Sequence, residues 1–85
     1  MSRSDPYIDS FAEVLRQQRE AQGFSQESLA LAVGLDRTFI SLLERGRRKP
    51  SYDTLVRISK ALNMKPEDFV AECGRGYLTA HSKKH

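Results

Sequence analysis

Apolar residues recur at spacings of three and four along most of the chain, from about residue 4 to residue 72. Near the N-terminus, for example, Ile8, Phe11, Ala12 and Leu15 share one face of a helix. A half-buried strand requires alternation with a period of two, which no stretch has. The pattern therefore predicts an all-α fold of five helices joined by short turns.

Capping residues divide this pattern into separate helices. A serine or aspartate before a helix accepts a backbone N–H, and a proline suits the first turn. The predicted starts are Pro6, preceded by Ser4 and Asp5, then Ser25, Asp36, Ser51 and Pro66. A glycine ends a helix well because it adopts the left-handed conformation at little cost. The predicted ends of the first three helices are Gly23, Gly34 and Gly46.

The helical pattern stops before the end of the chain. We expect residues 5–73 to form one domain, because 85 residues leave little room for a second core. Residues 74–85 contain two glycines, several basic residues and little periodicity. They are predicted to be a mobile basic tail.

The second and third predicted helices are separated by only three residues, Gly34, Leu35 and Asp36. This is the skeleton of a helix-turn-helix, in which the second helix enters the major groove of DNA. One side of the third helix is apolar and consists of Phe39, Ile40 and Leu43. The opposite side consists of Arg37, Thr38, Ser41, Leu42 and Arg45.

That second side has the chemistry needed to read base pairs. Arg37 can donate two hydrogen bonds to guanine, the hydroxyls of Thr38 and Ser41 can bond to bases, and Leu42 suits a thymine methyl group. The alternative is that these residues are only the solvated face of an amphipathic helix.

A cluster of cations follows this helix directly, and its position says more than the formal net charge of +3. The cluster comprises Arg45, Arg47, Arg48 and Lys49. For a helix lying in a groove, these side chains would meet phosphates and make binding sensitive to salt. The amides beside Ser51 are expected to hold another phosphate. Gln26 is expected to contact a phosphate or to brace a neighbouring side chain, and the alternative is an exposed glutamine with no role.

Arg19 falls at the same angle on the first helix as the apolar residues Ile8, Ala12 and Leu15. Its guanidinium therefore approaches the core and needs an anion. Glu44, near the end of the third helix, is the candidate. We predict an ion pair that orients the third helix rather than adding much net stability.

The composition excludes several other classes of protein. The single cysteine, Cys73, cannot form an internal disulfide, and no cluster of Cys and His offers a zinc site. No apolar run is long enough to span a membrane and no leader peptide is visible, so we expect a cytoplasmic protein. With no glycine-rich phosphate loop, and with His81 and His85 both near the C-terminus, we expect no catalysis, cofactor, metal or small-molecule substrate.

The runs Phe24–Ala30 and Val33–Gly46 resemble the lambda-repressor and Cro-like helix-turn-helix family, and the similarity extends over roughly residues 8–72. The stretches Gly34–Ser41 and Glu44–Gly46 most resemble controller proteins of restriction-modification operons. By matching position, the resemblance places base reading on Arg37, Thr38, Ser41 and Leu42. It places phosphate contacts on Gln26, Arg45, Arg47, Arg48 and Ser51, and an ion pair on Arg19 and Glu44. Several relatives carry a polar reader where this chain has Leu42.

The resemblance also implies a symmetric dimer on a pseudo-palindromic operator. Dimerisation has a physical motive, because one reading helix covers few base pairs and two helices double the contacts. The last predicted helix is the expected interface, through Phe69 and Val70 with Tyr77 and Leu78 nearby. For Phe69 the alternative is a place in the core.

The sequence thus predicts a transcription regulator that binds specific double-stranded DNA as a homodimer, and the resemblance implies the narrower role of a restriction-modification controller. The alternative is an antitoxin or adaptor that presents the same helices to a protein, and such a module does not need cations around the third helix. RNA binding is a third interpretation, but it lacks an aromatic platform because the tyrosines are scattered. Steep dependence of DNA binding on salt distinguishes the regulator from the adaptor.

Overall fold

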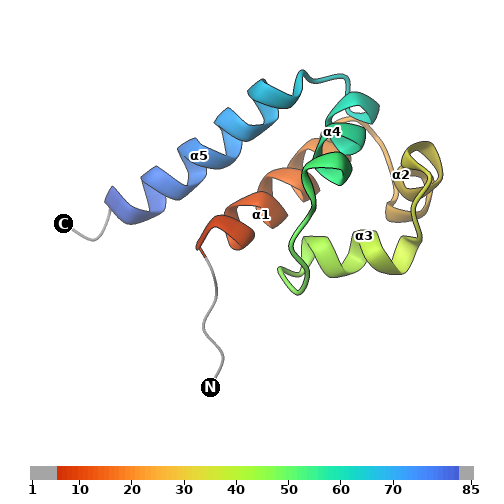
Figure 1. Ribbon diagram of the computed structural model, residues 1–85, viewed down its shortest axis with the longest axis horizontal. Coiled ribbons are helices and arrows are strands. Elements are labelled where there is room, and N and C mark those ends of the chain that lie inside the picture. Colours follow the sequence, from red (N-terminus) through yellow and green to blue (C-terminus); the bar gives the residue numbers. More distant parts are fainter. Residues whose placement is uncertain (1–5, 83–85) are drawn as a thin grey trace.

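The computed structural model describes the backbone of residues 6–82 and the side chains of residues 8–75, and within them it has five helices and no strand. The helices are α1 (Pro6–Ala21), α2 (Gln26–Val33), α3 (Arg37–Glu44), α4 (Tyr52–Ala61) and α5 (Pro66–Ser82). The predicted all-α class is confirmed. Figure 1 shows α5 lying along one side of α1, with α3 on the other side and α2 packed against α3 and α4.

The first four helices end in the same arrangement, in which one residue takes the left-handed conformation. These residues are Gly23, Gly34, Gly46 and Asn63, with φ values of 79°, 73°, 69° and 61°. The following residue donates its N–H to the carbonyl five positions earlier: Phe24 to Arg19, Leu35 to Ala30, Arg47 to Leu42 and Met64 to Ser59. These bonds satisfy carbonyls that a helix end leaves without partners, and they turn the chain sharply. The predicted glycine ends are confirmed.

Two of the predicted N-caps make the expected hydrogen bond. Ser25 accepts the N–H of Ser28, and Ser51 accepts the N–H of Thr54. Asp36 takes the extended N-cap conformation, but its side chain makes no capping bond. The helix starts at α2, α3 and α4 are therefore as predicted, although only two of them use the capping side chain.

The core lies where the five helices meet. Its fully buried members are Leu15, Leu29, Ile40, Leu43, Ile58, Leu62 and Phe69. Each such side chain stabilises the fold by roughly 1.5–3 kcal/mol through removal from water. Because α3 contributes both Ile40 and Leu43, its inner side is held rigidly against the body of the protein. None of the helices described here is both long and apolar enough to cross a bilayer.

The last helix is longer than the sequence pattern indicates. Its predicted end at Cys73 is wrong, because α5 continues through Gly74 to Ser82. A glycine weakens a helix by roughly 0.5–1 kcal/mol, but packing along a neighbour outweighs that cost. Here α5 lies against α1, and Ser10 Oγ donates a hydrogen bond to the carbonyl of Cys73. Residues 83–85 lie outside the described part of the chain.

Phe69 belongs to the core, and its assignment to a dimer interface is wrong. It is 0% exposed, and its ring meets that of Phe11 edge to face with centroids 5.6 Å apart. Val70, the next residue, is 47% exposed. Tyr77 and Leu78 lie within α5, but their side chains are outside the described residues.

Candidate nucleic-acid interface

The two sides of α3 differ as the apolar pattern predicts. Ile40 and Leu43 are completely buried, whereas Arg37 and Thr38 are exposed. The other two predicted base-reading residues, Ser41 and Leu42, are partly buried. The structure therefore anchors the back of α3 in the core and leaves Arg37 and Thr38 open to a partner. That these residues read bases stays a prediction.

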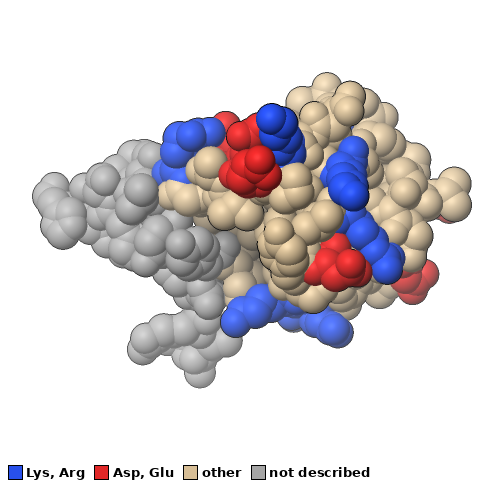
Figure 2. All heavy atoms as spheres, turned by 45° about the horizontal axis from the view of Figure 1, so that its top comes forward, with Lys and Arg blue, Asp and Glu red and all other residues tan. Residues whose placement is uncertain are grey.

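The cations around α3 have no acidic partners among the described residues. Four other arginines, Arg16, Arg19, Arg57 and Arg75, each lie within 4 Å of a carboxylate. By contrast, no described carboxylate lies that close to Arg37, Arg45, Arg47, Arg48 or Lys49, all of which are exposed. Figure 2 shows basic side chains in separate groups on one face, some with acidic neighbours. The positive charge at α3 and its following loop is thus not neutralised within the described chain, which suits a polyanionic partner.

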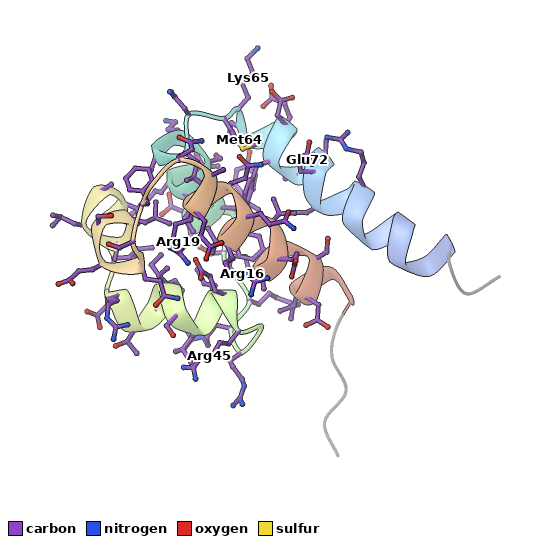
Figure 3. All side chains as sticks on the ribbon, turned by 180° about the vertical axis from the view of Figure 1, so that it is seen from behind. Arg16, Arg19, Arg45, Met64, Lys65 and Glu72 are labelled. Carbon is purple, nitrogen blue, oxygen red and sulfur yellow. The ribbon has the colours of Figure 1, made fainter. Side chains whose placement is uncertain are left out.

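Figure 3 shows how Arg45 and Arg19 lie relative to α3. Arg45 lies on the side of α3 that faces away from α1, whereas Arg19 points from α1 into the space between the two helices. The loop after α3 also carries Arg48, whose guanidinium carbon lies 5.4 Å from the ring centroid of Phe39. The apolar pattern placed Phe39 on the inner side, and no local signal indicates this contact, which depends on how the chain turns after Gly46.

The predicted ion pair between α1 and α3 is present and buried. Arg19 Nε donates to Glu44 Oε2 at 2.5 Å and Nη2 donates to Oε1 at 3.1 Å. The two side chains are only 10% and 4% exposed, respectively. Arg19 Nη1 also donates to the carbonyl of Phe24 at 2.8 Å, so the cation is well satisfied. Hydrogen bonding to Glu44 raises the pKa of the Arg19 guanidinium above its ordinary value.

Gln26 links this ion pair to the outer side of α3. Its Nε2 donates to Glu44 Oε1 at 3.0 Å, and its Oε1 accepts from Arg37 Nη1 at 3.4 Å. Of the two roles predicted for Gln26, the structure thus contains the brace, and the phosphate contact stays a prediction. A chain of polar contacts runs from buried Arg19 to exposed Arg37, and it restricts where the latter can point.

The start of α4 lies at the far end of the basic loop. Ser51 uses its hydroxyl within the helix start, since Oγ accepts from Thr54 N at 3.1 Å and donates to Thr54 Oγ1 at 3.0 Å. Its predicted phosphate contact therefore rests on the backbone amides. The neighbouring Tyr52 is 75% exposed, and no pattern in the sequence indicates that this large side chain belongs to the surface.

An apolar groove with a volume of about 340 Å³ lies between α1, α5, the start of α4 and the loop that precedes it. Its lining comprises Ile8, Phe11, Lys49, Pro50, Leu55, Val70 and Cys73. Half-exposed Val70 thus belongs to a wider apolar surface, which is what a dimer interface needs. Burial raises the pKa of the Cys73 thiol to about 11, so this cysteine is a poor nucleophile.

Residues 15–69 match the helix-turn-helix family HTH_3. The control protein C.BamHI of Bacillus amyloliquefaciens is 44% identical over 61 residues, which span 71% of this chain and 75% of the relative. The control protein C.SmaI of Serratia marcescens is 44% identical over 52 residues, or 61% of this chain and 62% of the relative.

Two solved structures are also similar. The restriction-modification controller protein C.AhdI from Aeromonas hydrophila has a TM-score of 0.71 and 37% identity, over 73% of this chain and 94% of that one. The controller protein C.Esp1396I, solved as a tetramer in complex with its natural 35 base-pair operator, has a TM-score of 0.78 and 30% identity. That match covers 85% of this chain and 95% of the other.

Proposed function

The chain belongs to the helix-turn-helix family, and from that premise we propose that it is a transcription regulator that binds specific double-stranded DNA as a homodimer. One observation carries the proposal. The outer side of α3 is open at Arg37 and Thr38, its inner side is anchored by Ile40 and Leu43, and the cations beside it have no carboxylate partner among the described residues. A rigid helix with one free polar side and neighbouring cations fits the major groove.

The proposed contacts divide into two kinds. Arg37, Thr38, Ser41 and Leu42 read base edges, and Arg37 is the residue able to grip guanine O6 and N7 together. The residues proposed to contact phosphates are Gln26, Arg45, Arg47, Arg48, Lys49 and Ser51. Contacts of the second kind give affinity and orientation for any sequence, whereas those of the first kind give specificity.

The similarity to controller proteins supports a narrower proposal. A regulator of a restriction-modification operon, acting on a pseudo-palindromic operator, fits the match to C.BamHI and the operator-bound tetramer of C.Esp1396I. A cytoplasmic location follows from that role, and the role requires no catalysis.

The proposed dimer uses the exposed part of α5 around Val70. Replacing Val70 with aspartate places a charge beside the apolar groove, and we expect it to weaken self-association measured by analytical ultracentrifugation. The affinity for a full operator should also fall, because two separate protomers then bind the two half-sites independently. An unchanged dimer would move the interface elsewhere.

Selection of bound duplexes from a random pool tests the proposed function directly. We expect a recurrent half-site, present in two copies about one DNA turn or roughly 34 Å apart. Binding should weaken steeply with salt, and Arg47→Ala should reduce the magnitude of the slope of log affinity against log salt by about 1.8, because the dimer loses one phosphate contact in each protomer. Arg75→Ala is the matched control, because Arg75 lies on α5, on the opposite side of α1 from α3. No enrichment together with salt-independent retention would favour the adaptor instead.

A further inference from the structure

The turn after α3 differs from the turns after the other three helices in one respect. After α1, α2 and α4, the residue that follows the left-handed position is Phe24, Leu35 or Met64, and each packs against the core. Such an apolar contact commonly accompanies this kind of helix end. After α3 the corresponding residue is Arg47, which is exposed. The basic loop therefore lacks the apolar anchor that the other turns have at this position.

A different contact links the loop to α3. The guanidinium carbon of Arg48 lies 5.4 Å from the centroid of the Phe39 ring, within the range of about 6 Å for a cation–π interaction. Phe39 is partly buried and packs against the core, so its ring is held in place. Gly46, with φ of 69°, reverses the chain, and a Cβ there would lie 3.0 Å from Asp9 Oδ1. This close turn brings Arg48 back over α3.

We propose that Phe39 is a positioning residue for the DNA backbone, and that its ring holds the guanidinium of Arg48 against α3, ready for a phosphate. The inference rests on the proposed function. A ring contacts the face of a guanidinium and leaves the N–H groups at its edge free to donate to phosphate oxygens. An arginine already ordered in the free protein loses less rotamer freedom when it binds. Arg48 also has no described carboxylate within 4 Å to compete with the phosphate.

A double-mutant cycle on the full chain tests this role, with a duplex of the selected sequence as the probe. Phe39→Leu keeps an apolar side chain but removes the aromatic face, and we expect it to weaken binding about 2–5-fold. Phe39→Tyr keeps the ring and should bind like the wild type. In the Arg48→Ala background, Phe39→Leu should cause no further loss, because the group that the ring positions is already absent. An equal loss in both backgrounds, or no loss in either, would overturn the proposal.

A second measurement needs no variant that might unfold. In the DNA-free wild-type protein, the δ-methylene protons of Arg48 should show an upfield ring-current shift by NMR. Random-coil shifts for these protons would mean that the ring does not hold Arg48, and would overturn the proposal. If the wild type binds no duplex at all, the proposed function fails and this role fails with it. If the wild type binds the duplex but the effects of substitutions at Phe39 and Arg48 are simply additive, only this inference fails.

Discussion

Replacing Glu44 with alanine removes the anion on which the buried cation of Arg19 depends. Arg19 keeps its hydrogen bond to the carbonyl of Phe24, but it loses both bonds to the carboxylate. Removing one partner of a buried ion pair costs about 3–5 kcal/mol, because the other charge stays buried. Glu20 lies 3.7 Å from Arg19 Nη2 and is 63% exposed, so it offers a weak substitute. We therefore expect a loss near the lower limit, about 3 kcal/mol.

Such a loss is large for a domain of this size, since single domains are stable by only about 5–15 kcal/mol. Each kcal/mol lowers Tm by roughly 4–8 °C in a domain of comparable length, so Tm should fall by roughly 12–24 °C. Thermal and urea unfolding followed by far-UV circular dichroism measure both quantities. Glu13→Ala is the matched control, because Glu13 is 55% exposed and its described partners, the cation of Arg16 and the amide of Gln17, are exposed as well. We expect this control to change stability by less than about 1 kcal/mol.

A Glu44→Ala protein as stable as the Glu13→Ala control would refute this reasoning. A second variant separates stability from orientation. Replacing Arg19 with methionine and Glu44 with leucine together removes both charges, which commonly restores stability. It also removes the acceptor that holds Gln26, and with it the link to Arg37. DNA affinity should therefore stay below that of the wild type, and full recovery of affinity would mean that the network does not orient α3.

Four further predictions concern other parts of the molecule. Arg37→Ala should cost about 1–3 kcal/mol in affinity per half-site and relax the preference at one base position in each half-site, as measured by titration against duplexes that vary there. Gly46→Ala should destabilise the fold by roughly 1–2 kcal/mol, because the residue is left-handed and a Cβ approaches Asp9. Gly74→Ala should instead stabilise α5 by roughly 0.5–1 kcal/mol, because no described side chain lies within 4 Å of the added Cβ. Urea unfolding measures the change in stability of both glycine variants. Changes of the same sign would contradict the difference in backbone conformation between Gly46 and Gly74. The Cys73 thiol ionises at its ordinary pKa of 9.0 when unfolded but at about 11 when folded. Stability relative to Cys73→Ala should therefore be fully present below pH 9.0 and fall as the pH rises to about 11, and a flat difference would contradict the burial of the thiol.

The sequence by itself predicted the features that depend on short stretches of chain. Ser25, Ser51 and Gly34 act on the backbone within a few residues of themselves, so the starts of α2 and α4 and the end of α2 could be inferred from the caps and the glycine. The Arg19–Glu44 pair was also predictable, because the helical angle indicated a buried cation and a buried cation requires an anion. The roles of the reading face were inferred in the same way, from angles along one helix.

Only the tertiary structure decided the features that depend on contacts between distant residues. It extended α5, which packs against α1, through Gly74 to Ser82, although the weak helix preference of glycine indicates an end there. It placed Phe69 against Phe11, whereas an apolar residue on a helix can equally face the core or a partner. It also brought Arg48 over Phe39, because the turn at Gly46 sets the direction of the loop. Local propensity decides where a helix begins and ends, but which surfaces meet depends on how the helices pack in three dimensions.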